Sequence, residues 1–169
     1  MSEFKIGVTG HRRLPADKLE SVRDSVRDFY ISVRERHPDA QITVLSSLAE
    51  GADSICAELA LDMGFKLVAP LPMSATEYRR DFAGSAAAQF DCLLSLADEV
   101  YVAPAEETPP GQPGRGFFYR QAGIYVARHG DVLLAVWNGI ERDTPDGAGT
   151  WETVKLAREF GRPVQRVLI

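Results

Sequence analysis

Apolar and polar residues follow two different patterns along this chain. Short apolar runs recur six times, and between them the apolar residues fall at three- and four-residue steps. Runs of the first kind are typical of buried strands, and spacing of the second kind is typical of amphipathic helices. The pattern predicts strands over residues 4–9, 41–45, 65–70, 99–103, 131–137 and 164–169.

The predicted helices lie between these strands. The longest begins at Pro15 or Ala16 and ends at Pro38, because a proline restricts the residue before it. Ser74 and Glu77 have the spacing of a capping box and start a short helix. Further helices are expected from the turn at residue 53 to Gly64, over residues 86–97 and 117–129, and from Thr150 to Phe160.

This alternation predicts a three-layer α/β domain, with a mostly parallel sheet and helices on both faces. The sequence shows no internal repeat, so residues 1–169 are expected to form a single domain. Ligands of such sheets bind beyond the carboxyl ends of the strands, at the topological switch point. The turns at Gly10, Ser46 and Gly147 each follow a strand, so we expect all three at one edge, around one cleft.

Residues 104–116 are expected to form a long surface loop. The segment is dense in Pro, Gly and Glu and has no periodicity. Its composition cannot bury much apolar surface, so we expect a loop that is mobile or that a ligand orders.

The net charge and the cysteine content of the chain argue against some classes of function. The net charge is −5 without any basic run, which argues against nucleic acid and membrane surfaces as partners, because phosphate binding needs clustered Lys and Arg. No apolar run approaches the roughly 20 residues of a membrane span. The chain enters a strand almost at once, so no signal peptide fits and a cytoplasmic protein is expected. Cys56 and Cys92 are expected to be reduced, buried thiols.

Several familiar fingerprints are missing. The first turn, Gly7-Val8-Thr9-Gly10, lacks the G-x-G-x-x-G of dinucleotide-binding folds, and no P-loop or G-x-S-x-G motif occurs. The three histidines, at positions 11, 37 and 129, do not have metal-ligand spacing. The sequence therefore predicts neither a cofactor nor a metal.

The stretch from Pro145 to Glu152 is the strongest candidate for a binding site. A strand, a glycine turn and a helix start follow one another there, so free N–H groups and the positive helix end are expected to meet an anion. Gly147 and Gly149 would allow a tight turn and close approach of a phosphate. Thr150 would cap the helix or bind the ligand, and Glu152 would accept hydrogen bonds from a ribose. The alternative is an ordinary helix start.

Three turns together resemble the SLOG superfamily, a Rossmann-like group that includes the DprA and Lonely-guy proteins. The turn Ile6-Gly7-Val8-Thr9-Gly10-His11-Arg12 is similar to the "VGSR" turn of DprA, and Ser46-Ser47-Leu48-Ala49-Glu50-Gly51-Ala52-Asp53 to its "SGLAxGID". The turn Gly147-Ala148-Gly149-Thr150-Trp151-Glu152 resembles the "GGT-x-D/E" of sensory SLOG families and the Lonely-guy "PGGxGTxxE". The three matches span nearly the whole chain in the expected order.

The resemblance implies a Rossmann-like domain that binds a nucleotide or a nucleotide-derived ligand at the strand-end edge. Two departures stand out: Ser47 replaces a usual glycine, and Glu152 follows the threonine by two positions where the Lonely-guy catalytic glutamate follows by three. Thr153 holds that third position. The ligand-binding residues that the resemblance implies are Gly10, His11, Arg12, Ser46, Ser47, Glu50, Gly51, Asp53, Gly147, Gly149, Thr150 and Glu152.

Several of these residues have a second interpretation. Asp53 could simply cap its helix, and His11 could face solvent, whereas the guanidinium of Arg12 suits a phosphate. Arg120, after the long loop, could reach the same edge. Trp137 is either a platform for a base or a packing residue at the end of the sheet. Phe118, Tyr119 and Tyr125 would stack on a base or belong to the core.

Three functions compete. The first is a module that binds or senses a nucleotide-like small molecule without turning it over. The second is a nucleoside 5′-monophosphate phosphoribohydrolase, with Glu152 as the candidate catalytic acid and Arg12 or Arg120 on the phosphate. The third is a DprA-like binder of single-stranded DNA, which the acidic balance disfavours. The sequence leaves the oligomeric state open, a homo-oligomer included.

Overall fold

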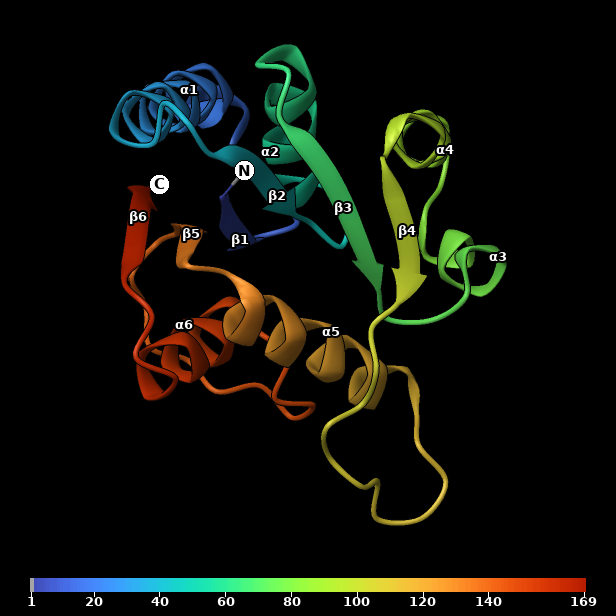
Figure 1. Cartoon of the computed structure of the whole chain (residues 1–169). Helices are drawn as coiled ribbons and strands as arrows, with labels where there is room; N and C mark the ends of the chain where they lie inside the picture. Colours follow the sequence, from blue (N-terminus) through green and yellow to red (C-terminus); the bar gives the residue numbers. More distant parts are fainter. Residues whose placement is uncertain (1) are drawn as a thin grey trace.

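A computed structural model describes residues 2–169 and contains one six-stranded sheet in which every strand is parallel to its neighbours (Figure 1). The strand order is β4-β3-β2-β1-β5-β6. Each strand lies within two residues of its predicted limits. The strands are β1 (Glu3–Gly10), β2 (Gln41–Leu45), β3 (Lys66–Leu71), β4 (Glu99–Val102), β5 (Val132–Trp137) and β6 (Val164–Leu168).

Helices cover both faces of this sheet, as predicted, so the fold is a three-layer Rossmann-like α/β domain (Figure 1). The helices α1, α2 and α4 pack on one face, and α5 and α6 pack together on the other. Two 3₁₀ turns, at Ala16–Lys18 and Arg79–Asp81, adjoin α1 and α3. The helices are α1 (Leu19–Arg36), α2 (Ala52–Asp62), α3 (Ala75–Tyr78), α4 (Ser85–Leu96), α5 (Arg115–His129) and α6 (Thr150–Glu159).

The strands carry apolar residues on both faces because each face is covered. In β5, Leu134 and Val136 belong to the core beneath α1 and α2, while Leu133, Ala135 and Trp137 belong to the core beneath α5 and α6. Successive side chains of a strand point to opposite faces, so one apolar run serves both cores. This explains why the predicted strands read as continuous apolar runs.

The sheet has its switch point between β1 and β5. From β1 the chain proceeds outward through β2, β3 and β4, and then returns to place β5 on the other side of β1. The carboxyl ends of the two strands stand side by side, with Gly10 paired to Val136. The helices that follow neighbouring strands there lie on opposite faces, which leaves a crevice at this edge.

Two local expectations are wrong. Thr150 is the first helical residue of α6 rather than its cap, because Gly149 occupies the N-cap position. Cys56 is buried as expected, but Cys92 is exposed, because it lies on the outer side of α4, away from the Phe90 and Leu93 face. None of the helices in the described part of the chain combines the length and apolar character that a bilayer crossing requires.

Candidate functional site

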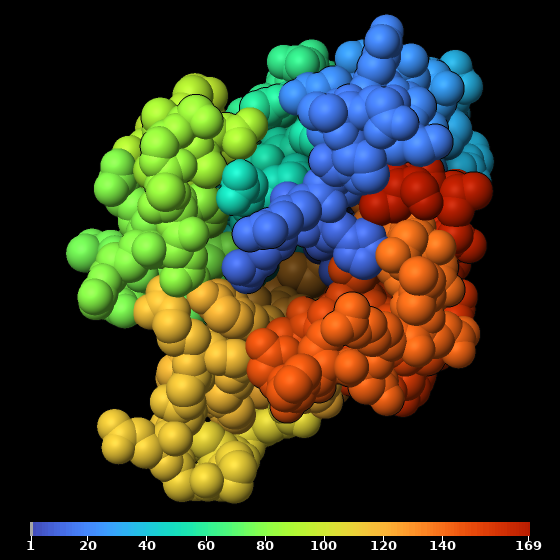
Figure 2. Space-filling view, turned by 180° about the vertical axis from the view of Figure 1, so that it is seen from behind, coloured from blue at the N-terminus to red at the C-terminus, as the bar shows by residue number. Residues whose placement is uncertain are grey.

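A cleft of about 380 Å³ lies at the switch point, between the ends of β1 and β5 and the start of α6. It brings together the first and third of the turns singled out in the sequence. Figure 2 shows the blue turn after β1 between the green α3 region and the orange segment that leads to α6. The cleft is lined by Gly10, His11, Arg12, Trp137, Asn138, Ile140, Arg142, Thr144, Ala148, Gly149, Thr150 and Trp151.

Close packing of the first two turns places Arg12 at the cleft. A Cβ on Gly10 would overlap the side chain of Ala52, and the N–H of Ala52 donates to the carbonyl of His11 at 3.1 Å. Gly51 has φ +89°, and a Cβ there would collide with the carbonyls of His11 and Arg12. Both glycines are therefore required by backbone approach within the protein, and α2 begins against the first turn.

His11 ties the end of β5 to the start of α6 and does not simply face solvent. Its Nε2 accepts from the backbone N–H of Asn138 at 3.3 Å, and its Nδ1 lies 3.4 Å from Thr150 Oγ1. A backbone N–H can only donate, so Nε2 carries no proton in this arrangement. In the neutral ring the proton is then on Nδ1, and the hydroxyl of Thr150 accepts it.

The cleft is basic although the chain is acidic. Arg12 and Arg142 line it, and no Asp or Glu does. Within residues 2–169 neither arginine forms an ion pair. Arg12 instead lies over the ring of Tyr119, with its Cζ 4.9 Å from the ring centroid. Both guanidinium groups therefore have donors free for an anion.

The start of α6 adds backbone donors to the cleft. Gly149 is the N-cap and makes no side-chain cap, so the first N–H groups of the helix have no partner among the described residues. The N–H of Ala148 is already taken by Asp146 Oδ1 at 3.0 Å. Unpaired N–H groups and the positive end of the helix dipole both favour an anion at this point.

Glu152 is turned away from the cleft, against the expectation that it contacts a ribose. Its side chain is buried, and Oε1 accepts from the N–H of Thr144. The hydroxyl of Thr144 lies 2.8 Å from the same oxygen and 2.9 Å from Asp146 Oδ1, so the two carboxylates share its single proton. Its Oε2 has no hydrogen-bond partner. A Cβ on Gly149 would lie 2.5 Å from that Oε2, so Gly149 makes room for the buried carboxylate rather than for a phosphate.

Arg120 and Gly147 also lie outside the cleft lining. Gly147 has φ +68°, a conformation that favours glycine, and its carbonyl accepts from Arg120 Nη1 at 2.9 Å. The same guanidinium pairs with Glu107 at 2.8 and 3.2 Å. Arg120 does reach the strand-end edge, but its donors hold two loops in place.

The second turn contributes less to the cleft than expected. Ser46 is buried, and its hydroxyl donates to the carbonyl of Asp53 at 3.0 Å, so it closes the turn. Glu50 is exposed and lies in a shallow hollow with Glu58 of α2 and Ser85 of α4. The acidic surroundings of Glu50 do not suit a phosphate.

Ser47 and Asp53 line a second, smaller hollow of about 90 Å³ that adjoins the cleft and shares Gly10, Arg12 and Ala148 with it. Asp53 is not the N-cap of α2, since Gly51 is. Its Oδ2 accepts from the N–H of Ala49 at 3.3 Å. Burial raises the pKa of this carboxyl from 3.8 to about 7, and the N–H of Ala49 and the charge of Arg12 oppose the rise.

The aromatic residues divide between packing and lining. Trp137 is buried and stacks on Trp151 with ring centroids 5.8 Å apart, so it packs at the end of the sheet and also lines the cleft. Tyr125 bonds to the hydroxyl of Tyr101 at 2.7 Å, away from the cleft. Sequence reasoning missed Trp151 and Arg142. The first directly follows Thr150, which could have signalled it, whereas nothing local marks Arg142.

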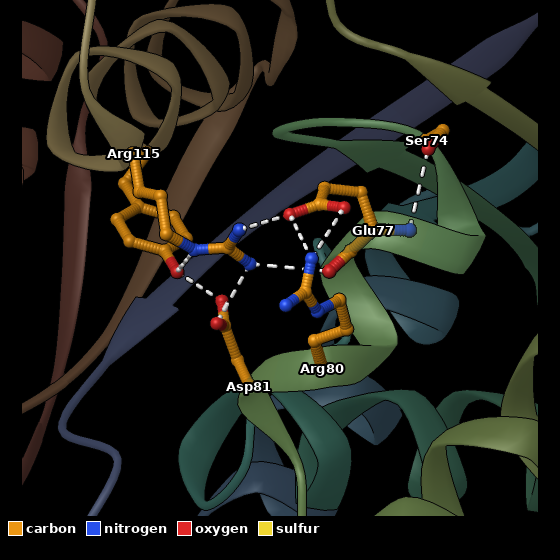
Figure 3. A network of polar contacts seen from close by, with 6 residues as sticks. Ser74, Glu77, Arg80, Asp81 and Arg115 are labelled. Carbon is orange, nitrogen blue, oxygen red and sulfur yellow. Dashed lines mark hydrogen bonds and ion pairs between the residues drawn. The ribbon is translucent and has the colours of Figure 1, made fainter.

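A polar network joins α3 and the 3₁₀ turn after it to the start of α5 (Figure 3). Arg115, the first residue of α5, pairs with Glu77 at 2.6 Å and with Asp81 at 2.7 Å. The hydroxyl of Tyr119 donates to Asp81. These contacts hold α3 against α5 and fix the ring on which Arg12 lies. No group of three or more His, Cys, Asp or Glu within residues 2–169 is arranged to hold a metal.

Comparison with known proteins shows a shared fold. No protein-family model matches the chain, and no curated protein matches it either. The DNA processing protein A (DprA) of Streptococcus pneumoniae superposes with a TM-score of 0.64 at 20% identity, over 97% of this chain and 50% of that one. DprA from Helicobacter pylori, described for its single-stranded DNA binding mode, gives 0.60 at 17% over 98% and 65%.

A third solved structure, TM1055, gives a TM-score of 0.53 at 15% identity, over 95% of this chain and 72% of that chain. The chain thus spans about half of the pneumococcal DprA and under two thirds of the Helicobacter protein. Sequence identities this low show only that the fold is shared. The chain therefore has a Rossmann-like domain of the kind found in DprA.

Proposed function

We propose that this protein binds a nucleotide or a nucleotide-derived small molecule, with its phosphate in the cleft between β1 and β5. One observation carries the proposal. Arg12 and Arg142, neither of them in an ion pair, line a cleft without a carboxylate, next to the unpaired N–H groups of α6. In a chain of net charge −5, such a local excess of positive charge favours an anionic ligand.

The chemistry of the cleft suits a phosphate group. A guanidinium offers paired donors that match phosphate oxygens, and charge-assisted hydrogen bonds of this kind are about twice as strong as neutral ones. The start of α6 supplies backbone donors from a second direction. The partly exposed ring of Trp151, which stacks on Trp137, forms an apolar wall beside the arginines for the base of the ligand to contact.

Binding without turnover is the version of this function that the acidic residues support. Cleavage of an N-glycosidic bond needs a carboxylate near the anomeric carbon to stabilise the developing positive charge. Glu152 is engaged with Thr144 behind the cleft. Thr153, one position later, carries no charge, and the cleft lining holds no acid; Asp53 lines the smaller hollow beside it, and it does not occupy the position of the Lonely-guy acid after the threonine.

Single-stranded DNA is the second candidate. It is favoured by the surroundings of Trp151, where Lys155 Nζ and Arg158 Cζ lie 5.7 and 6.0 Å from the ring centroid. Bases stack on such a ring while cations meet the phosphates. The sequence contains no basic run that would track a longer DNA strand, which counts against single-stranded DNA. We therefore prefer a ligand of the size of a mononucleotide.

The test is calorimetric titration with AMP, GMP, CMP, UMP, inorganic phosphate and a short oligothymidylate. We expect at least one mononucleotide to bind, and Arg142→Gln to weaken it by about tenfold or more, since a hydrogen bond to a charged group is worth roughly 1.5–3 kcal/mol. Arg13→Gln is the matched control, because Arg13 is exposed and does not line the cleft. Equal effects of the two substitutions would refute the proposal.

A further inference from the structure

The smaller hollow beside the cleft has a polar lining of its own. It adjoins the basic cleft through Gly10, Arg12 and Ala148, so a ligand whose phosphate meets Arg12 can extend into it. The volume of about 90 Å³ is roughly a quarter of that of the cleft and takes a small ring rather than a base with its substituents. The donors and acceptors of this lining determine which chemical groups it can recognise.

The hollow is lined by several hydrogen-bond acceptors. Asp53 is 9% exposed, and only its Oδ2 has a partner, the N–H of Ala49. Its Oδ1 has no hydrogen-bond partner within residues 2–169 although the side chain lines the hollow. Because Oδ1 is not one of the sealed, unpartnered atoms of the structure, it is open to the hollow, and its lone pairs are available to a ligand that donates to it.

The hydroxyl groups nearby are also set to accept. Ser47 Oγ donates its proton to the carbonyl of Pro70 at 2.8 Å, and Thr153 Oγ1 donates to the carbonyl of Gly149 at 3.3 Å. Each of these hydroxyl groups donates its only proton within the protein, so it can only accept hydrogen bonds from a group in the hollow. A second anionic group is therefore disfavoured there.

Donors line the hollow as well. The hydroxyl of Tyr78 has no partner among the described residues, and burial raises the pKa of this phenol, so it keeps its proton. Arg12 lines the hollow as well. A lining with both acceptors and donors matches a group whose atoms do both, and hydroxyl groups are the common case.

We propose that this hollow is a subsite for the sugar of the ligand, in which Asp53 accepts hydrogen bonds from ribose hydroxyls and thereby sets the preference for a ribosyl phosphate. The proposal rests on the function proposed above, because the phosphate must first be placed by Arg12 and Arg142. The hydroxyls of Ser47, Thr153 and Tyr78 complete the contacts around the ring.

The probes are ribose 5-phosphate, 2-deoxyribose 5-phosphate and inorganic phosphate, titrated calorimetrically at pH 8, where Asp53 is mostly ionised. We expect wild type to bind ribose 5-phosphate at least tenfold more tightly than inorganic phosphate. We expect Asp53→Asn to reduce that preference to about threefold or less, while affinity for inorganic phosphate does not fall, because a negative charge near Arg12 is removed. Ser47→Ala is the milder variant, with a smaller loss in the same direction.

The outcomes separate the two proposals. If ribose 5-phosphate binds no more tightly than inorganic phosphate to wild type, the sugar subsite is wrong, whatever the variants do. If ribose 5-phosphate binds more tightly but Asp53→Asn keeps the full preference, Asp53 does not recognise the sugar and the proposal also fails. In both cases, a loss of phosphate affinity in Arg142→Gln would still support the proposed phosphate site. If no phosphate-bearing probe binds, the proposed function itself falls.

Discussion

The guanidinium of Arg120 donates to the carbonyl oxygen of Gly147 at 2.9 Å, although the two residues come from α5 and from the loop that precedes α6. The same group holds Glu107 of the long loop with two hydrogen bonds. One side chain thus joins both long irregular segments of the domain, residues 103–114 and 138–149.

We predict that Arg120→Gln loosens both segments at once. A glutamine cannot reproduce the paired contact with Glu107 and reach Gly147 as well, because it has one planar amide in place of the forked guanidinium. Hydrogen exchange should become faster in both segments, with little change in the strands. Arg79→Gln, which breaks an exposed pair with Asp91, is the control and should leave both segments unchanged. Faster exchange in only one segment would contradict the coupling.

The long loop remains predicted to be the most accessible segment to proteases. Its start is fixed, since the N–H groups of Glu106 and Glu107 both donate to the buried Gln121. From residue 108 onward no comparable anchor to a helix or strand exists until α5 begins at Arg115. Brief digestion with a protease of broad specificity should therefore cut first between residues 108 and 114. A first cut in the 138–149 segment would show this expectation wrong.

Glu152→Gln should affect stability and not catalysis. Glu152 Oε1 accepts from Thr144, and the amide oxygen of a glutamine can keep that role, but the amide NH₂ would replace the buried, unpartnered Oε2 and would find no acceptor there. We therefore expect a lower melting temperature, with a loss of roughly 1–3 kcal/mol for a buried donor without a partner. We expect neither wild type nor Glu152→Gln to release free base from AMP, GMP, CMP or UMP, as measured by chromatography. Steady turnover by wild type that disappears in Glu152→Gln would make the protein a phosphoribohydrolase.

Asp53 should make the stability of the ligand-free protein depend on pH. Its pKa is about 7 in the folded protein and 3.8 ordinarily, so between about pH 4 and 7 the folded state holds a proton that the unfolded chain has lost. The contribution of this group to stability is therefore full below about pH 4 and declines as the pH rises to 7. Above pH 7 it stays constant.

Asp53→Asn removes this dependence, because an amide does not titrate in that range. The variant should gain stability over wild type as the pH rises from 4 to 7, by an upper limit of roughly 4 kcal/mol at 1.36 kcal/mol per pKa unit. Melting temperatures at pH 4.5, 6 and 8 check the trend, with Asp39→Asn on the exposed loop after α1 as the control. An advantage that shrinks as the pH rises would refute the assignment.

The sequence by itself determined the elements and their class. Apolar runs such as residues 132–137 are typical of strands covered on both faces, and strict alternation with helices favours a parallel sheet. It also placed the turns at Gly10, Ser46 and Gly147 at one edge, since each follows a strand. These are consequences of local periodicity, which every short window of the chain carries.

Only the tertiary structure decided which side chains meet at that edge. His11 contacts Thr150 across 139 positions because β5 pairs with β1, and no local pattern encodes that strand order. Arg142 enters the cleft from an irregular loop, and Glu152 turns inward because Thr144 offers it two donors. The orientation of a side chain depends on its long-range partners, so the sequence predicted the edge correctly but not the direction in which Glu152 faces.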